Sequence, residues 1–167
     1  VYPPTGYGPA ELMPTGRSVI VVGLRQLDGV IESNVTDAKT SYVYGNYGYV
    51  HLNRELNSIC FDLARWLEAR ACRTLPLGPS MGGRYNHLAD EDESIIAPLS
   101  GIFSLKRAAV LAGVGRKAKN GLVSNPVHGV RIRLACLITA APLEGDPLLP
   151  GDPCPPGCTV CMDVCPM

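Results

Sequence analysis

The cysteines near the end of the chain are the residues whose type and spacing point most directly to chemistry. Four of the seven cysteines lie in the run CPPGCTVCMDVCPM, at Cys154, Cys158, Cys161 and Cys165. Bacterial 4Fe–4S proteins use the pattern C-x2-C-x2-C-x3-C-P, and this run differs from it by one extra residue in the first gap. Thiolates are the soft ligands that iron–sulfur clusters require. The spacing therefore predicts four metal ligands and favours a 4Fe–4S cluster.

Two other interpretations of these cysteines stay open. A structural zinc site with four thiolates is usually built from two separate C-x2-4-C pairs, which one compact run matches less well. Free or disulfide-bonded cysteines are the third interpretation. The remaining cysteines, Cys60, Cys72 and Cys136, lie on apolar segments. We expect them to be buried as small apolar side chains.

Composition bounds the class of protein. A chain of 167 residues that is 46% hydrophobic is long and apolar enough for one folded domain with a core. Lys+Arg and Asp+Glu are both 15, and this neutral balance weighs against a nucleic-acid partner. Apolar runs fall well short of the roughly 20 residues that span a membrane, and no signal segment opens the chain. Together with bunched cysteines, this predicts a cytoplasmic protein without a membrane partner.

Hydrophobic periodicity predicts a layered α/β (α+β) domain, because strand and helix patterns alternate along the chain. The first strand, a continuous apolar run, is expected to be buried on both faces, and Pro76 is expected to place its strand at a sheet edge. A tyrosine-rich stretch, 40–50, predicts a loop with aromatic anchors, and the polar stretch 78–101 predicts a solvated loop or a lid. The predicted elements are strands at 18–24, 74–77 and 131–139 and helices at 52–70 and 104–112.

A second chemical signal lies in residues 112–147. Gly113 and Gly115 follow the predicted helix, and glycines at such a point let the backbone pass close to another group. The basic residues Arg116, Lys117 and Lys119 then precede an Asn120-Gly121 turn signal and could hold phosphate or carboxylate groups. The pattern is not a dinucleotide fingerprint, because it follows a helix and lacks the third Gly. Lys119 and His128 can equally be surface residues, and Arg131 and Arg133 can form the solvent face of a strand.

The order of motifs resembles the superfamily of epoxyqueuosine reductases and reductive dehalogenases. A helix ending in Ala-Gly-Val-Gly is followed by Lys119, Asn-Gly-Leu-Val, Asn-Pro-Val-His-Gly, an apolar strand, Pro-Leu-Glu and the cysteine run. The resemblance implies a nitroreductase-like, corrinoid-binding domain over residues 1–141. It also implies a Pro-rich linker and a partial 4Fe–4S ferredoxin-type segment over residues 142–167.

The resemblance assigns roles residue by residue. Lys119 would lie in the loop beside a cobalamin and act as a catalytic cation that stabilises developing negative charge. Cys154, Cys158 and Cys161 would ligate one cluster and Cys165 another. The other positions that would bind the cofactor are Gly113, Gly115, Asn125, His128 and Gly129.

This chain departs from the epoxyqueuosine reductase pattern in three places. No acid is present in residues 98–103, where those enzymes carry a catalytic Asp, and Arg116-Lys117-Ala118 replaces Trp-Ile-Gly. A second ferredoxin motif is missing. We therefore expect a reaction other than tRNA modification. Because the chain begins at Val1 and stops just after the cysteine run, we also expect further sequence at both ends.

The resulting hypothesis is a cobalamin- and iron–sulfur-dependent reductase. It would receive electrons from a ferredoxin- or flavodoxin-type donor, act on an unknown small molecule and form a homodimer. A proton donor would come from Tyr85 or His87. The alternatives are an electron-transfer protein of the same descent without corrinoid chemistry, and a non-catalytic binding module in which a metal holds the tail together.

Overall fold

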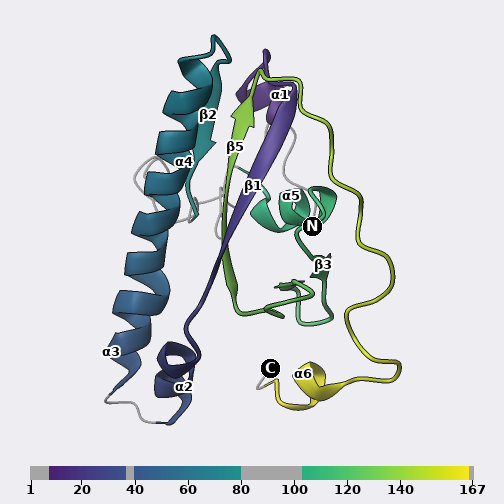
Figure 1. The fold of residues 1–167 in the computed structure, drawn as a ribbon. Helices are drawn as coiled ribbons and strands as arrows, with labels where there is room; N and C mark the ends of the chain where they lie inside the picture. The colour runs from purple at the N-terminus through teal and green to yellow at the C-terminus, as the bar shows by residue number, and fades with distance from the viewer. Residues whose placement is uncertain (1–7, 37–39, 80–102, 166–167) are drawn as a thin grey trace, which may run out of the picture.

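A three-stranded sheet forms the centre of the computed structural model, which describes residues 8–36, 40–79 and 103–165 (Figure 1). The strands are β1 (Ser18–Arg25), β2 (Thr74–Leu77) and β5 (Ile132–Thr139), in the order β1-β5-β2. β5 pairs antiparallel with both neighbours, and Cys136 lies opposite Val21 and Leu77. Helices lie on both sides of this sheet, so the predicted layered α/β class is confirmed, with antiparallel pairing throughout the described strands.

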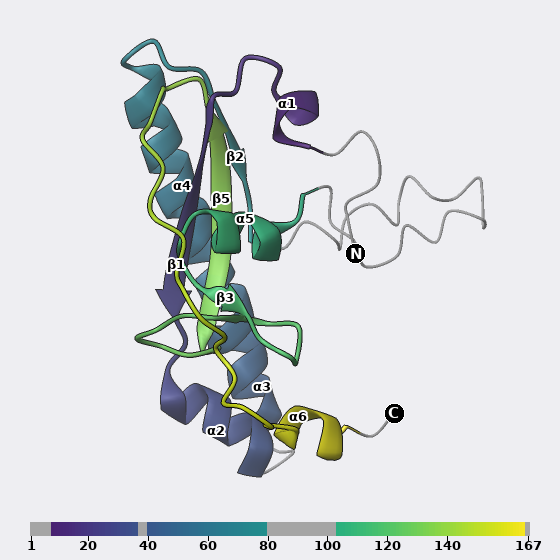
Figure 2. The same ribbon diagram turned by 90° about the vertical axis from the view of Figure 1, so that its right-hand side faces the viewer.

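One face of the sheet is covered by the long helix α4 (Leu52–Glu68), which runs along the strands in Figures 1 and 2. Its buried residues recur at three- and four-residue steps, as the amphipathic pattern predicted: Leu56, Cys60, Ala64 and Leu67. Leu56, Cys60 and Leu67 form one core cluster with Ala135 and Leu137 of β5. The helix is therefore held mainly by burial of this stripe.

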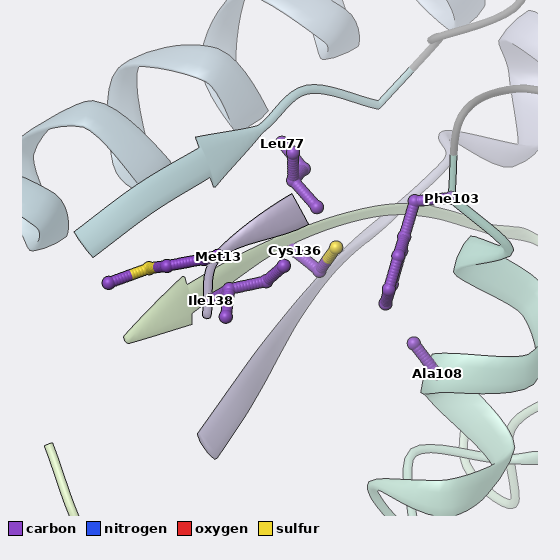
Figure 3. Packing of buried hydrophobic residues seen from close by; sticks show 6 residues of the cluster. All are labelled: Met13, Leu77, Phe103, Ala108, Cys136 and Ile138. Atoms are coloured by element: carbon purple, nitrogen blue, oxygen red, sulfur yellow. The ribbon is translucent and has the colours of Figure 1, made fainter. Parts of the chain in front are cut away.

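The opposite face packs against two short helices, α1 (Pro9–Leu12) and α5 (Leu105–Leu111). Side chains alternate between the faces of a strand, so Cys136 and Ile138 point away from α4. They pack with residues from the other elements in a second cluster (Figure 3). The remaining buried members of this cluster are Met13, Leu77, Phe103 and Ala108.

The prediction that residues 18–24 are buried on both faces is wrong. β1 lies at the edge of the described sheet, and all of its residues are half-buried or exposed. The strand that is buried is the central β5, from Ala135 to Thr139. Hydrophobic content alone did not distinguish these two strands, because both read as apolar runs. The edge position expected for Pro76 is confirmed by β2.

The loop predicted for residues 40–50 is also wrong. This stretch forms helix α3 (Ser41–Val43) and the π-helix η2 (Tyr44–His51), which continues directly into α4. Its glycines disfavour a helix intrinsically, so tertiary contacts must hold it. The Gln26 side chain donates to the Gly48 carbonyl at 3.3 Å, and the Arg133 guanidinium lies 3.8 Å from the centre of the Tyr49 ring.

A further helix, α2 (Asp28–Thr36), is tied to the sheet by ion pairs. Asp28 accepts hydrogen bonds from Arg25 and Arg131, each at 2.5 Å. The hydrogen bond from Arg131 is the main cause that lowers the pKa of Asp28 below its ordinary value. A carboxyl with a lowered folded-state pKa stabilises the fold above its unfolded pKa, and this contribution disappears as the pH falls through the folded-state pKa.

We therefore expect Asp28→Asn to lower stability slightly at pH 7 and to have less effect at pH 3. The effect is small because the carboxyl is exposed to solvent. Urea unfolding midpoints of the wild type and the variant at both pH values measure it. A difference that is as large at pH 3 as at pH 7 would contradict the role given to this carboxylate.

Three short elements complete the described fold. The strands β3 (Arg116–Lys117) and β4 (Val123–Ser124) form an antiparallel hairpin, and α6 (Val160–Asp163) is a single turn within the cysteine run. Residues 142–153, which lead from β5 toward α6, have no regular secondary structure. In the part of the chain that the structure describes, no helix has the length and apolar character to cross a membrane.

Candidate site at the basic hairpin and the cysteine segment

The β3–β4 hairpin closes with a tight turn at the position of the Asn-Gly signal. The Ala118 N–H donates to the Leu122 carbonyl at 2.8 Å, and the Gly121 N–H donates to the Ala118 carbonyl at 2.9 Å. Gly121 has φ +76°, the left-handed conformation that closes a three-residue hairpin loop. Lys119 therefore occupies the second position of a β-turn, where its own N–H points out of the hairpin ladder.

Lys119 connects this turn to the cysteine segment, residues 152–165, at two points. Its backbone N–H donates to Cys154 Sγ at 3.4 Å, and its Nζ donates to the Cys158 carbonyl at 2.7 Å. On the same hairpin, Arg116 Nη1 donates to the Leu149 carbonyl at 2.6 Å. The linker consequently passes beside β3, as Figure 2 shows. The basic hairpin and the cysteine segment, which are separate chemical signals in the sequence, are thus in direct contact.

Gly113 and Gly115 show the close backbone approach expected from their sequence pattern. Gly113 has φ +68° and ends the turn after α5, and a Cβ on it would lie 2.6 Å from the Pro147 carbonyl oxygen. A Cβ on the buried Gly115 would lie 2.6 Å from the Ser124 carbonyl oxygen. Both glycines approach carbonyl groups of the chain's own backbone, so they allow the linker and β4 to pack closely against this turn. Their part in binding a cofactor stays a prediction.

We expect Gly115→Ala to lower the free energy of unfolding by roughly 1–3 kcal/mol, because the added methyl group overpacks a backbone contact. Chemical denaturation at constant pH measures this change. Gly29→Ala is the matched control: a Cβ at Gly29 meets nothing within 4 Å, and the residue lies in α2. The control should be neutral or stabilise the protein by up to about 1 kcal/mol. Equal losses in both variants would contradict the packing at Gly115.

Asn125 fixes the turn that follows β4. Its Nδ2 donates to the Val114 carbonyl at 2.6 Å, and its Oδ1 accepts from the N–H groups of Val127 and His128 at 2.9 and 3.1 Å. Gly129, with φ +57°, closes the turn through a bridge to Asn125. The turn is therefore locked to the backbone between the two glycines. It presents His128 to solvent, where that residue is exposed and can meet a ligand.

The four tail cysteines lie close together in the chain but are not gathered into a metal site. All are free, with Cys154, Cys158 and Cys161 half-buried and Cys165 exposed. Among the described residues, which include all four, no three His, Cys, Asp or Glu side chains are grouped as metal ligands. The donor set itself fits an iron–sulfur cluster, since four accessible thiols share one short segment that already accepts an N–H···S hydrogen bond. On binding a cluster, the segment would have to fold so that the cysteine sulfurs converge on it, because metal binding and folding are coupled in such sites.

The other cysteines differ from the tail in their surroundings. Cys60 and Cys136 are buried, and burial raises the pKa of both thiols, that of Cys136 to about 12. Thiols with such raised pKa values stay protonated near neutral pH, so they are poor ligands and nucleophiles. The expectation of buried apolar cysteines is confirmed for these two. Cys72 is only half-buried.

A cleft of about 760 Å³ opens between β1, α5 and the linker. Val21, Phe103 and Ala108 contribute apolar surface to it. Its lining also includes four charged residues: Arg17, Arg107, Glu144 and Asp146. The sequence did not predict this cleft because its walls come from segments that are far apart in the chain. Ala112 and Val114, on either side of Gly113, also line it, so it adjoins the predicted cofactor-binding loop.

Some predicted features fall outside the described residues. These are the candidate proton donors Tyr85 and His87, nearly all of the polar stretch 78–101, and most of the segment 98–103 that lacks an acid.

Comparison with known proteins places this arrangement of strands and helices in a known fold. Epoxyqueuosine reductase from Bacillus subtilis, solved with its catalytic loop swung out of the active site, superimposes with a TM-score of 0.60 at 20% identity. A crystal structure of epoxyqueuosine reductase with an epoxyqueuosine-modified tRNA-Tyr stem loop superimposes with a TM-score of 0.53 at 19% identity. Each match covers 94% of this chain and 37% of the solved chain. The fold is thus that of the epoxyqueuosine reductases.

Sequence comparison indicates common descent in addition to the similar fold. The chain is 37% identical over 67 residues to epoxyqueuosine reductase of Bacillus subtilis strain 168, a match that covers 40% of this chain and 17% of that enzyme. No family model matches the chain. The chain is therefore a homologue of epoxyqueuosine reductase, which confirms the resemblance read from the motifs. It spans 37% of the length of the solved relatives and aligns with 17% of the curated one.

Proposed function

We propose that this chain is the iron–sulfur-binding part of a reductase related to epoxyqueuosine reductase. The observation that carries the proposal is the contact of Lys119 with Cys154 and Cys158. The family resemblance implies that Lys119 would lie in a loop beside a corrinoid and that the cysteines would surround a cluster. Electron transfer between two such groups requires that the segments holding them lie close together, and here they touch.

In this proposal Cys154, Cys158 and Cys161 hold a 4Fe–4S cluster, and Cys165 contributes to a second one. When bound, the cluster supplies one-electron transfer and the cobalamin supplies the reducing chemistry. The protein's own residues position these groups. Asn125 orients the turn that presents His128, and Lys119 both anchors the tail and supplies positive charge near the site.

The domain boundary near residue 141 belongs to the same proposal. Ser18 Oγ donates to the Ala141 carbonyl at 2.8 Å, and the Leu143 N–H donates to Ser18 Oγ at 3.0 Å. The Ser18 hydroxyl thus fastens the chain at the point where the sheet ends and the exposed linker begins. Residues 1–141 would form the nitroreductase-like domain, and residues 142–167 would bring the cluster to its surface.

We infer two candidate substrate classes. A small molecule follows from the sequence, and the cleft beside α5 is large enough to hold one. An RNA stem loop is the second class, because a structural neighbour is solved with one. The neutral net charge of the chain is by itself only weak evidence against an RNA substrate. Residues 98–103 contain no acid, which favours a reaction different from that of the homologue.

The absence of an acid from residues 98–103 also favours a second candidate function, electron transfer without corrinoid chemistry. Iron, acid-labile sulfide and cobalt contents of the anaerobically purified full chain separate the two. Iron and sulfide with cobalt support the reductase, whereas iron and sulfide without cobalt after incubation with cobalamin support the electron carrier. Zinc in place of iron would contradict both.

A further inference from the structure

Lys119 makes two contacts with the cysteine segment, one from its backbone N–H and one from its side-chain ammonium group. We propose that Lys119 sets the reduction potential of the cluster that this segment holds. The inference rests on the proposed function, because it requires a cluster on Cys154 and Cys158. It makes Lys119 a positioning residue for the electron-transfer group, in addition to the role that the resemblance assigns to it beside a corrinoid.

The first contact is the hydrogen bond from the Lys119 N–H to Cys154 Sγ, at 3.4 Å. Position two of a β-turn leaves its N–H outside the hairpin ladder, so this donor is available for the sulfur. Hydrogen bonds to cluster sulfurs are one of the means by which a protein sets the potential of an iron–sulfur cluster. Reduction adds negative charge, and a donor aimed at a ligand sulfur stabilises the reduced state more than the oxidised one.

The second contact places a positive charge at the next ligand. Lys119 Nζ donates to the Cys158 carbonyl at 2.7 Å. Two carboxylates lie on the same segment: Asp152 accepts from the Cys154 N–H, and Asp163 accepts from the Thr159 hydroxyl. The Lys119 hydrogen bond brings a cationic side chain against this negatively charged segment. Its ammonium group therefore offsets negative charge at the ligands.

The turn geometry allows these two contacts to be removed separately. Lys119→Met removes the ammonium group and keeps the N–H. Lys119→Pro removes both donors, and Pro is favoured at the second position of such turns. Lys117→Met is the matched control, because Lys117 is exposed on the same hairpin and its side chain makes no hydrogen bond or ion pair within the described residues.

The experiment is a spectroscopic redox titration of the full chain and the three variants, purified anaerobically with their clusters. We expect the potential to become more negative in Lys119→Met and more negative again in Lys119→Pro. A tenfold change in the one-electron equilibrium corresponds to about 59 mV, and we expect a shift of about this size for Lys119→Pro. Lys117→Met should leave the potential near that of the wild type.

The outcomes distinguish this inference from the proposed function. A wild-type chain that holds no cluster overturns the proposed function itself. Clusters present in the wild type and in Lys119→Met at the same potential overturn the inference and leave the proposed function standing, whether or not Lys119→Pro retains its iron. An equal shift in Lys117→Met would also overturn it, because general charge would then explain the effect.

Discussion

Replacing Cys158 by Ser is expected to abolish most of the visible absorbance of the anaerobically purified chain and to lower its bound iron. A hydroxyl group is a poor ligand for a cluster that requires soft thiolates. Cys158 lies between Cys154 and Cys161 in the segment, and its carbonyl accepts a hydrogen bond from the Lys119 ammonium group. Loss of its sulfur should therefore break the ligand set while the contact with the hairpin remains.

Cys72→Ser is the control for this result. Cys72 is half-buried near the end of α4, outside the tail, and its Sγ donates to the Arg70 carbonyl, which a hydroxyl can also do. The control should retain iron and absorbance at the wild-type level. If Cys158→Ser retained them as well, the tail would not be the cluster ligand. Cys165→Ser then tells a single cluster, which it would disturb, from a two-cluster arrangement, in which the first cluster would persist.

Leu56→Ala is expected to have the largest effect on stability, lowering the free energy of unfolding by about 2–5 kcal/mol. Leu56 is completely buried between α4 and the sheet, where it packs with Leu137 and Ala135. Truncation removes apolar contact and leaves a cavity in a cluster that fixes α4 to β5. Urea denaturation of both proteins measures the difference.

Ile59→Ala on the same helix is the matched control. Ile59 is 37% exposed and does not belong to the buried stripe. Substitutions at such surface positions usually change stability by no more than about 0.5 kcal/mol. If the two substitutions cost the same, α4 would not present the face described for it.

Elements with strong local patterns were predicted well from the sequence. The helix expected at 52–70 is α4 (Leu52–Glu68), and the strand expected at 131–139 is β5 (Ile132–Thr139). The Asn120-Gly121 turn was also correct, because a glycine with positive φ closes a short hairpin whatever surrounds it. In each case local chemistry and tertiary packing favour the same structure.

Features that depend on contacts distant in sequence were not predicted. The helical course of residues 41–51 depends on Gln26 and Arg133, which lie in other elements. The exposure of β1 depends on its place at the edge of the sheet. At the site, the spacing of the cysteines was informative, but nothing in the sequence predicted that Lys119 would contact Cys154 from 35 residues away.

The absorbance spectrum of the anaerobically purified full chain, before and after chemical reduction, shows whether the tail cysteines hold an iron–sulfur cluster. If Cys154, Cys158 and Cys161 hold an iron–sulfur cluster, the protein is brown, with a broad visible band that bleaches on reduction. Additional sharper visible bands would come from a bound corrinoid. A colourless protein that contains zinc would show that the tail cysteines do not hold an iron–sulfur cluster.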